Sequence, residues 1–219
     1  MIVLKTSREL SAMRAAGRIS SRALRLAGEA VEPGVSTWEI DRMVRRYIEE
    51  QGAVPTFLGY GGFPASSCIS VNNVVIHGIP GKKIILKQGD IVSIDIGATF
   101  EGFVGDNAWT FPCGDVSEEA QSLMNATREA LFEGIAAAKA GNRIGDIGSA
   151  VQRYVEARGY SVVRSFVGHG VGAKMHEDPA VPNYGTPGRG VRLLPGMTIA
   201  IEPMINEGVK AVSYTHLRA

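Results

Sequence analysis

The sequence has few cysteines, no long apolar run and almost no net charge, and each shortage excludes a class of protein. Its two cysteines, Cys68 and Cys113, form neither a CxxC pair nor a disulfide framework, which favours a reducing compartment. No apolar run approaches the roughly 18 residues that span a bilayer. The first nine residues contain too few apolar side chains for a signal peptide. We therefore expect a cytoplasmic protein without a membrane segment.

The charge balance gives no direct signal for nucleic-acid binding. Twenty-three Lys and Arg residues face 22 Asp and Glu residues, so the formal net charge is only +1. This is too little for a broad attraction to phosphate backbones or anionic lipids. Hydrophobic residues make up 45% and charged residues 21%, and the length of 219 residues suits one domain or two small halves. These values are typical of a globular protein that buries a sizeable core.

Two aspartates in a predicted β-hairpin are the first candidates for chemistry. Residues 90–106 carry β-forming side chains interrupted by glycines, which predicts two antiparallel strands joined by a turn. A turn centred on Phe100–Glu101 would place Asp95 directly opposite Asp106 on one face. Two carboxylates there repel and lose hydration, and a divalent cation would offset both costs. The alternative is a turn shifted by one residue, so that the aspartates face opposite ways and one caps a strand end.

Four helices are predicted from capping residues and from apolar side chains at helical spacing. The residues that begin the first three are Thr6, Ser36 and Ser117. Thr6 and Ser36 are each followed three residues later by a glutamate, as in a capping box. The expected ends are near Glu29, Gly52 and Gly141, and the fourth helix is expected over residues 146–158.

The two pairs of helices are related by an internal repeat. Shifting the chain by 107 residues aligns seven identical residues in nineteen positions, from Gly34 with Gly141 to Gly52 with Gly159. Chance would give about one or two. We therefore expect one α+β domain over residues 1–219 that is built from two related halves, about residues 1–112 and 113–212. Their strands are expected to form a sheet with helices on one side.

Two neighbouring segments of the first half lie between its helices and the Asp95 hairpin. Residues 53–67 form a loop with several glycines and prolines and three aromatic residues, Phe57, Tyr60 and Phe63. Such a loop either packs on the core or lines a pocket. A second hairpin is predicted with Asn72–Asn73 at its turn, since Asn tolerates positive φ. This turn would place Cys68 opposite His77.

The second half adds three more groups suited to metal chemistry. His169 stands between glycines, which could also mark a tight turn, and His176 precedes Glu-Asp-Pro. Glu202 lies near the end of a strand predicted over residues 197–204. Carboxylates with one or two imidazoles suit Mn²⁺, Fe²⁺, Co²⁺ or Zn²⁺. Two bridging carboxylates indicate a two-metal site, which activates water and polarises a carbonyl, so hydrolysis of an amide or ester would fit.

Six motifs, in order, resemble those of the type I methionine aminopeptidases of peptidase family M24. They are Cys68-Ile-Ser-Val-Asn with Val-Ile-His77-Gly-Ile-Pro, Asp90-Ile-Val with Asp95, Gly105-Asp106, Gly168-His169-Gly-Val-Gly, His176-Glu-Asp-Pro and Ile201-Glu202-Pro-Met. The resemblance covers about residues 3–212. It implies the pita-bread fold, two divalent metal ions (Co²⁺, Mn²⁺, Fe²⁺ or Zn²⁺) and hydrolytic removal of the N-terminal methionine before a small second residue.

The resemblance also assigns roles, residue by residue. The implied metal ligands, with Asp106 bridging, are Asp95, Asp106, His169 and Glu202. The implied methionine pocket, which is apolar and suits a thioether, consists of Tyr60, Phe63 and Cys68. Glu202 would move a proton from water to the leaving amine, and His176 would donate to the oxyanion or to the peptide behind it. His77 would contact the scissile amide and help the leaving nitrogen.

The end of the chain departs from the family pattern. The family's last ligand is a glutamate that bridges both metals, and it has no match here. Residues 213–219 do not look like the family's continuation, which indicates a truncation or a foreign tail. His216 in this tail is expected to be an accident rather than a ligand. Loss of a bridging carboxylate should weaken metal binding, so the activity of this chain does not follow from its family.

Two alternative functions follow from the same residues. A pita-bread binding module that has lost catalysis would fit the missing ligand, whereas the intact Asp95, Asp106, His169 and Glu202 argue against it. An Xaa-Pro aminopeptidase-like or creatinase-like hydrolase would share the fold but usually carries an additional N-terminal domain, and the apolar Cys68 pocket favours methionine. For the methionine aminopeptidase we expect a monomer. Its partners would be the N-termini of nascent polypeptides, with the ribosome as one place of encounter.

Overall fold

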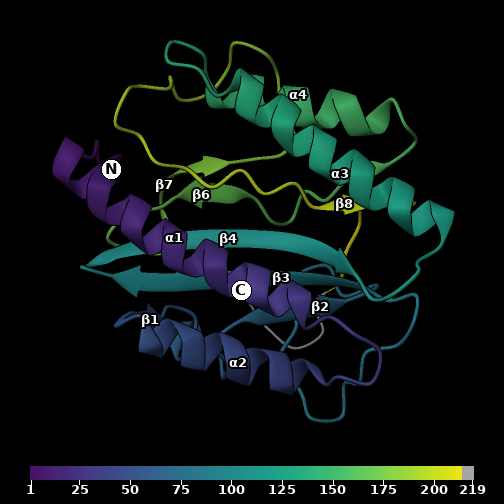
Figure 1. Cartoon of the computed structure of the whole chain (residues 1–219). Helices are drawn as coiled ribbons and strands as arrows, with labels where there is room; N and C mark the ends of the chain where they lie inside the picture. The colour runs from purple at the N-terminus through teal and green to yellow at the C-terminus, as the bar shows by residue number, and fades with distance from the viewer. Residues whose placement is uncertain (214–219) are drawn as a thin grey trace. The chain divides into compact units, whose positions relative to one another are not determined.

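The chain folds into helices and antiparallel strands that form two compact units (Figure 1). The computed structural model describes residues 1–213. The N-terminal unit comprises residues 7–118 and 172–175, and the C-terminal unit comprises residues 1–6, 119–171 and, within the described part of the chain, 176–213. No helix within the described residues is both long and apolar enough to cross a membrane.

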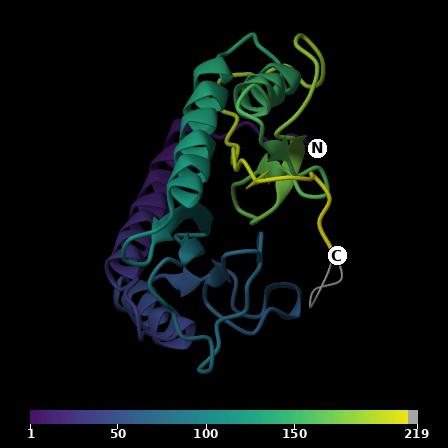
Figure 2. The same cartoon turned by 90° about the vertical axis from the view of Figure 1, so that its right-hand side faces the viewer.

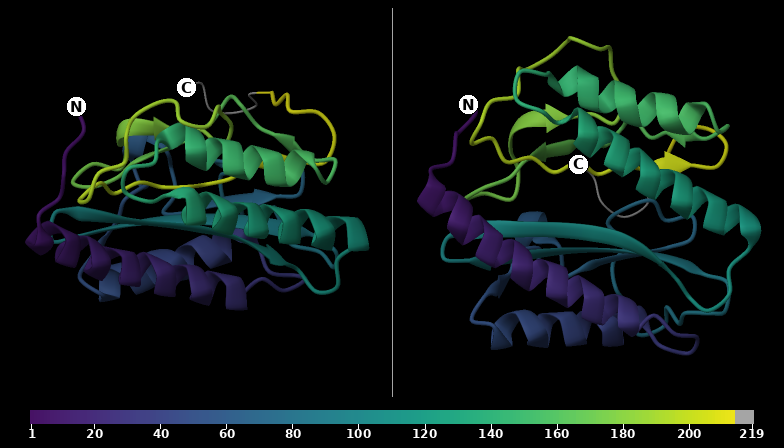
Figure 3. Two further views of the ribbon diagram at one scale, coloured as in Figure 1. Left: turned by 90° about the horizontal axis from the view of Figure 1, so that it is seen from above. Right: turned by 45° about the horizontal axis from the view of Figure 1, so that its top comes forward.

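The N-terminal unit is a four-stranded antiparallel sheet with two helices on one face (Figure 3). Its helices are α1 (Ser7–Glu29) and α2 (Thr37–Glu50), and its strands are β1 (Val54–Pro55), β2 (Cys68–Val71), β3 (Ile91–Phe100) and β4 (Phe103–Pro112). A 3₁₀ turn, η1 (Tyr60–Gly62), interrupts the loop between β1 and β2. The central strand β3 pairs with β4 along one edge and with β1 and β2 along the other.

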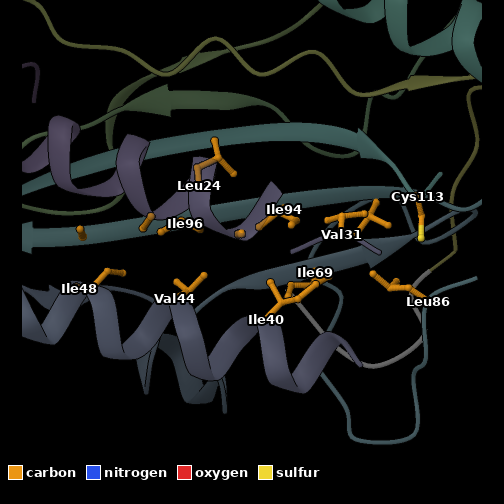
Figure 4. Close-up of a cluster of buried hydrophobic side chains, with 14 of the residues drawn as sticks. Leu24, Val31, Ile40, Val44, Ile48, Ile69, Leu86, Ile94, Ile96 and Cys113 are labelled. Atoms are coloured by element: carbon orange, nitrogen blue, oxygen red, sulfur yellow. The ribbon is translucent and has the colours of Figure 1, made fainter. Parts of the chain in front are cut away.

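The core of this unit is on the helix-covered face of β3 (Figure 4). Val92, Ile94 and Ile96 are completely buried among side chains of α1 and α2, and each such burial stabilises the fold by about 1.5–3 kcal/mol. Because side chains alternate along a strand, the residues between them, including Asp95, point to the opposite face. The hydrophobic pattern thus fixes which face of the sheet carries the carboxylates.

The helix predictions are confirmed at α1 and α2 and need adjustment at α3 (Glu118–Ala137) and α4 (Ile144–Glu156). Ser36 caps α2 as predicted. Its hydroxyl and, to a lesser extent, its backbone N–H donate hydrogen bonds to the Glu39 carboxylate, and these bonds lower the pKa of Glu39. Helix α4 begins two residues before the predicted start, because Asp146 accepts the Arg143 N–H at 2.7 Å and is therefore the third helical residue.

The β3–β4 hairpin is present, but the predicted pairing of Asp95 with Asp106 is wrong. Asp95 pairs with Ala108, and Asp106 pairs with Gly97. The turn lies one residue later than predicted because Glu101 and Gly102 have the positive φ angles, 50° and 80°, that a two-residue hairpin turn needs. The register therefore differs by two positions, which keeps both carboxylates on one face as diagonal neighbours.

The second predicted hairpin is not formed, so Cys68 does not lie opposite His77. Strand β2 pairs with β3 instead, which makes Asp95 the cross-strand partner of Cys68. Asn72 causes this difference: its side chain donates to the Asp90 carboxylate at 2.8 Å and accepts the Ile91 N–H at 3.0 Å. These bonds tie the end of β2 to β3. His77 has φ = 59°, a conformation that a continuing strand does not adopt.

The C-terminal unit places α3 and α4 beside one another with two short two-stranded sheets (Figure 2). The sheets pair β5 (Ser161–Val162) with β8 (Ile205–Asn206) and β6 (Gly168–Gly170) with β7 (Glu177–Val181). Helices α2 and α4 begin at Thr37 and Ile144, which is the 107-residue offset of the sequence repeat. Val151 and Val155 of α4 form a buried cluster with Ala130 of α3.

The strand predicted over residues 197–204 is largely absent. This segment makes a single bridge, from Ile199 to Gly170, and the Ala200 N–H donates to the His169 carbonyl at 2.7 Å. Because β6 has only three residues and an irregular register, it cannot support a longer ladder. Ile199 and Ile201 still pack on the cluster beneath α4.

Candidate active site

Three of the predicted site residues share one face of the N-terminal sheet. Cys68 lies directly opposite Asp95, and Asp106 is the diagonal neighbour of Asp95 on the adjacent strand. Atom Oδ1 of Asp95 is shielded from solvent. Burial, and after it the negative charges of Asp95 and Asp106, raise the pKa of the Cys68 thiol. Cys68 is therefore a neutral, compact, weakly polar side chain beside the two carboxylates.

The loop of residues 53–67, called the aromatic loop below, reaches this carboxylate face because of Gly97, for which the sequence predicted no role. A Cβ atom at Gly97 would lie 2.7 Å from Cε1 of Phe57, so only glycine lets Phe57 approach the strand. The two predicted pocket residues of this loop differ in exposure: Phe63 is buried, whereas Tyr60 is 48% exposed. The loop therefore both packs on the unit and presents an aromatic ring to solvent.

His77 lies in the segment that follows β2 and is half-buried. The segment is held tightly against β2, since the Ile69 N–H donates to the Gly78 carbonyl at 2.8 Å and the Gly78 N–H donates to Ser70 Oγ at 3.0 Å. A Cβ atom at Gly78 would lie 2.1 Å from the Ile69 carbonyl oxygen. This close backbone contact fixes where His77 leaves the strand.

The C-terminal unit brings the other three predicted residues together. Nε2 of His169 lies 3.4 Å from Oε1 of Glu202, and the rings of His169 and His176 are 4.3 Å apart, centroid to centroid, in an edge-on arrangement. His176 directly precedes β7, whose first residue, Glu177, forms a partly buried ion pair with Lys5 at 2.5 Å. The ion pair fixes the start of β7 next to His176.

The environment of His169 suits a metal ligand. Its Nδ1 lies 2.8 Å from the Gly170 carbonyl oxygen, so in the neutral ring Nδ1 carries the proton and Nε2 carries the lone pair. Metal-binding histidines commonly donate their second N–H to a carbonyl in this way. Two ligand atoms of one ion, each about 2.1 Å from it at a tetrahedral angle, would lie about 3.4 Å apart. The separation of His169 Nε2 and Glu202 Oε1 fits this geometry.

The full ligand set stays a prediction. Among residues 1–213, no group of three or more His, Cys, Asp or Glu side chains is placed so that it could hold a metal ion. The donor chemistry nevertheless fits a divalent cation: each unit has two of the predicted ligands, and shielded carboxylate oxygens occur in both, on Asp95 and on Glu202. The tail with His216 lies outside the described residues, apart from Ser213.

Asn183 is a neighbour of Glu202 that the sequence analysis missed. Its Nδ2 donates to the Glu202 carbonyl at 2.8 Å, and its side chain is almost completely buried. It therefore holds the backbone of the segment that carries the carboxylate. Nothing in the single sequence distinguishes Asn183 from an ordinary loop asparagine, because the contact joins residues 19 positions apart.

Known proteins resemble this chain over nearly its whole length. Residues 11–217 match the sequence model of metallopeptidase family M24. A curated methionine aminopeptidase from Clostridium perfringens is 55% identical over 208 residues, which cover 95% of this chain and 83% of that protein. The crystal structure of a methionine aminopeptidase from Thermotoga maritima matches with 44% identity and a TM-score of 0.97, over 99% of this chain and 87% of the other.

A comparison with a prolidase bears on the alternative of an Xaa-Pro aminopeptidase-like hydrolase. The prolidase from Pyrococcus horikoshii matches with 25% identity and a TM-score of 0.79, over 93% of this chain but only 56% of that protein. The identity to the methionine aminopeptidases is about twice as high, and the predicted α+β pita-bread fold is confirmed. The chain therefore belongs to metallopeptidase family M24 and, within it, to the methionine aminopeptidases.

Proposed function

We propose that this protein removes the N-terminal methionine of polypeptides by metal-dependent hydrolysis. The observation that carries the proposal is the pair of His169 and Glu202, whose Nε2 and Oε1 atoms lie 3.4 Å apart as two ligands of one ion would. The Nδ1 contact to the Gly170 carbonyl supports it, because it leaves the lone pair on Nε2. The 55% identity to a methionine aminopeptidase supports the choice of substrate.

We assign the metal ligands as Asp95, Asp106, His169 and Glu202. A divalent ion held by these residues would lower the pKa of water and polarise the scissile carbonyl. Glu202 takes the proton from the attacking water and returns it to the leaving amine. His176, next to His169, donates a hydrogen bond to the carbonyl oxygen as negative charge develops on it. His77 contacts the scissile amide and assists the leaving nitrogen.

The substrate assignment extends to the methionine side chain and to the partners. Phe63 and Cys68 are buried, and the neutral Cys68 thiol suits contact with a thioether; Tyr60 completes the pocket. We propose two metal ions, chosen from Co²⁺, Mn²⁺, Fe²⁺ and Zn²⁺, and a preference for a small second residue. The physiological substrates are then the N-termini of nascent polypeptides in the cytoplasm. The enzyme is a monomer that binds them at the ribosome.

The direct test is release of free methionine from a Met-Ala peptide, with Mn²⁺ or Co²⁺ added and a chelator as the control. We expect release that depends on the metal. The assay is repeated with Fe²⁺ and with Zn²⁺, and a folded protein that binds metal but releases no methionine with any of the four ions would contradict the proposal. It would favour the alternative of a binding module that keeps the fold without catalysis.

The variant His176→Ala separates the role of this residue from that of a metal ligand. We expect kcat for Met-Ala to fall by about 10²–10³-fold, the usual effect of removing one donor to an oxyanion. Bound metal, measured by elemental analysis after gel filtration, should stay at the wild-type level, because His176 is assigned to the substrate. If the metal content falls in proportion to the activity, His176 is a ligand and the assignment is wrong.

A further inference from the structure

A buried carboxylate on α2 contacts the end of the aromatic loop. Oδ1 of Asp41 accepts three hydrogen bonds, from the Ser66 N–H at 2.9 Å, the Ser67 N–H at 2.9 Å and the Ser67 hydroxyl at 2.8 Å. All three residues are buried. All three bonds end on one oxygen atom, and each of them satisfies a donor that is shielded from water. Asp41 is therefore a strong attachment point for this stretch of backbone.

Residues 57–65, the middle part of the aromatic loop, are held at both ends. At its start, the Thr56 N–H donates to the Gly97 carbonyl at 2.9 Å and the Thr56 hydroxyl bonds to that of Thr99 at 2.9 Å. At its end it is held by Asp41 through Ser66 and Ser67. Between these points lie Tyr60 and Phe63, and Cys68 follows directly. Asp41 thus acts on the segment that carries all three predicted pocket residues without being one of them.

The repeat offers a comparison for this position. The 107-residue offset aligns Asp41 of α2 with Gly148 of α4. A Cβ atom at Gly148 would lie 2.3 Å from the Tyr184 carbonyl oxygen and 2.6 Å from that of Pro182. Both helices therefore face a loop from this position, but α4 does so without a carboxylate. The helix packing by itself does not require a charge at position 41.

We propose that Asp41 is a positioning residue that fixes the methionine pocket and so determines how strictly the enzyme selects methionine. The proposal rests on the proposed function, since it takes Tyr60, Phe63 and Cys68 as the pocket. Loss of the carboxylate would leave three buried donors without their acceptor, and the loop would gain freedom. A mobile pocket loses affinity for the methionine side chain, whereas the groups that perform hydrolysis are unchanged.

The test compares Asp41→Ala and Asp41→Asn with Glu49→Ala, which removes an exposed carboxylate from the same helix. For Asp41→Ala we expect KM for Met-Ala to rise about tenfold or more with kcat within about threefold. Discrimination between Met-Ala and Leu-Ala should fall by a similar factor. Asp41→Asn keeps an acceptor oxygen, so its KM and its discrimination should lie between those of the wild type and those of Asp41→Ala. Glu49→Ala should match the wild type in both. A fall in kcat alone, or unchanged discrimination, would overturn the proposal.

Amide hydrogen exchange tests the loop independently of activity. In Asp41→Ala, the amides of residues 57–67 should exchange at least about tenfold faster, while those of β3 stay protected. If Asp41→Ala does not fold, Asp41→Asn and Ser67→Ala, which removes only the hydroxyl donor, serve the same comparison. Unchanged loop exchange in a folded variant would overturn the proposal. If the wild type releases no methionine, the proposed function fails and the inferred selectivity with it, whereas exchange still decides whether Asp41 holds the loop.

Discussion

Glu202→Gln should lower kcat for release of methionine by at least about 10³-fold. A glutamine keeps the shape of the side chain, but it can neither take a proton from water nor return it to the leaving amine, and general acid–base catalysis alone contributes about 10²–10⁴-fold. The substitution also removes the charge that faces His169 Nε2 at 3.4 Å. Metal affinity should fall as well, in contrast to the His176→Ala variant.

The matched control is Glu207→Gln, the same change at an exposed glutamate five residues further along the chain. It should retain wild-type activity and metal content. The measurement is methionine release per bound metal ion, with metal titrated to saturation in each variant. If Glu202→Gln regains more than a tenth of the wild-type kcat at saturating metal, Glu202 binds metal without moving the proton.

The helices could be predicted from the sequence because their signals are local. The Ser36 and Glu39 capping box lies within four residues, and the apolar spacing that follows it lies on the same helix. The start of helix α4 differs from the prediction by two residues for a related reason: Asp146 is the third residue of the helix and accepts the Arg143 N–H, whereas its sequence position alone also fits a first residue. Errors of this size follow from the ambiguity of a single cap residue.

The strand pairings were harder because they depend on distant residues. The face of Asp95 follows from the alternation around it, but its partner depends on which two residues adopt positive φ, and Glu101 rather than Phe100 does so. The partner of β2 was missed for a stronger reason. The Asn72 side chain bonds to Asp90 and Ile91, a contact across 18 to 19 residues that turn propensity does not encode.

Of two residues around the predicted site, Asp41 could have been identified from the sequence and Gly97 could not. Asp41 leaves a signal, since it lies three and seven residues before Val44 and Ile48 and so shares the apolar face of its helix. A charge on such a face needs buried donors, and that argument could have identified it. Gly97 leaves no comparable signal, because its importance depends on the ring of Phe57, which the chain brings there from 40 residues away.

Gly105→Ala should destabilise the fold strongly. A Cβ atom at Gly105 of β4 would lie 2.3 Å from the Ala16 carbonyl carbon and 2.4 Å from the Gly17 nitrogen of α1. Both atoms belong to the helix backbone, so they cannot turn aside as a side chain can. The helix would have to move off the sheet and disturb the core that α1 shares with β3. We expect a loss of about 3 kcal/mol or more, the upper end of the cost of overpacking.

The matched control adds the same methyl group on the other side of this contact. Gly17 lies inside α1, and a Cβ atom there would meet nothing within 4 Å. Gly17→Ala should therefore stabilise the protein by about 0.5–1 kcal/mol, since alanine favours a helix and restricts the unfolded chain. Urea and thermal unfolding, followed by circular dichroism, should show changes of opposite sign. If Gly105→Ala unfolds within about 1 kcal/mol of the wild type, α1 and β4 can separate at little cost. The close backbone contact would then not be what holds β4, and with it Asp106, in place.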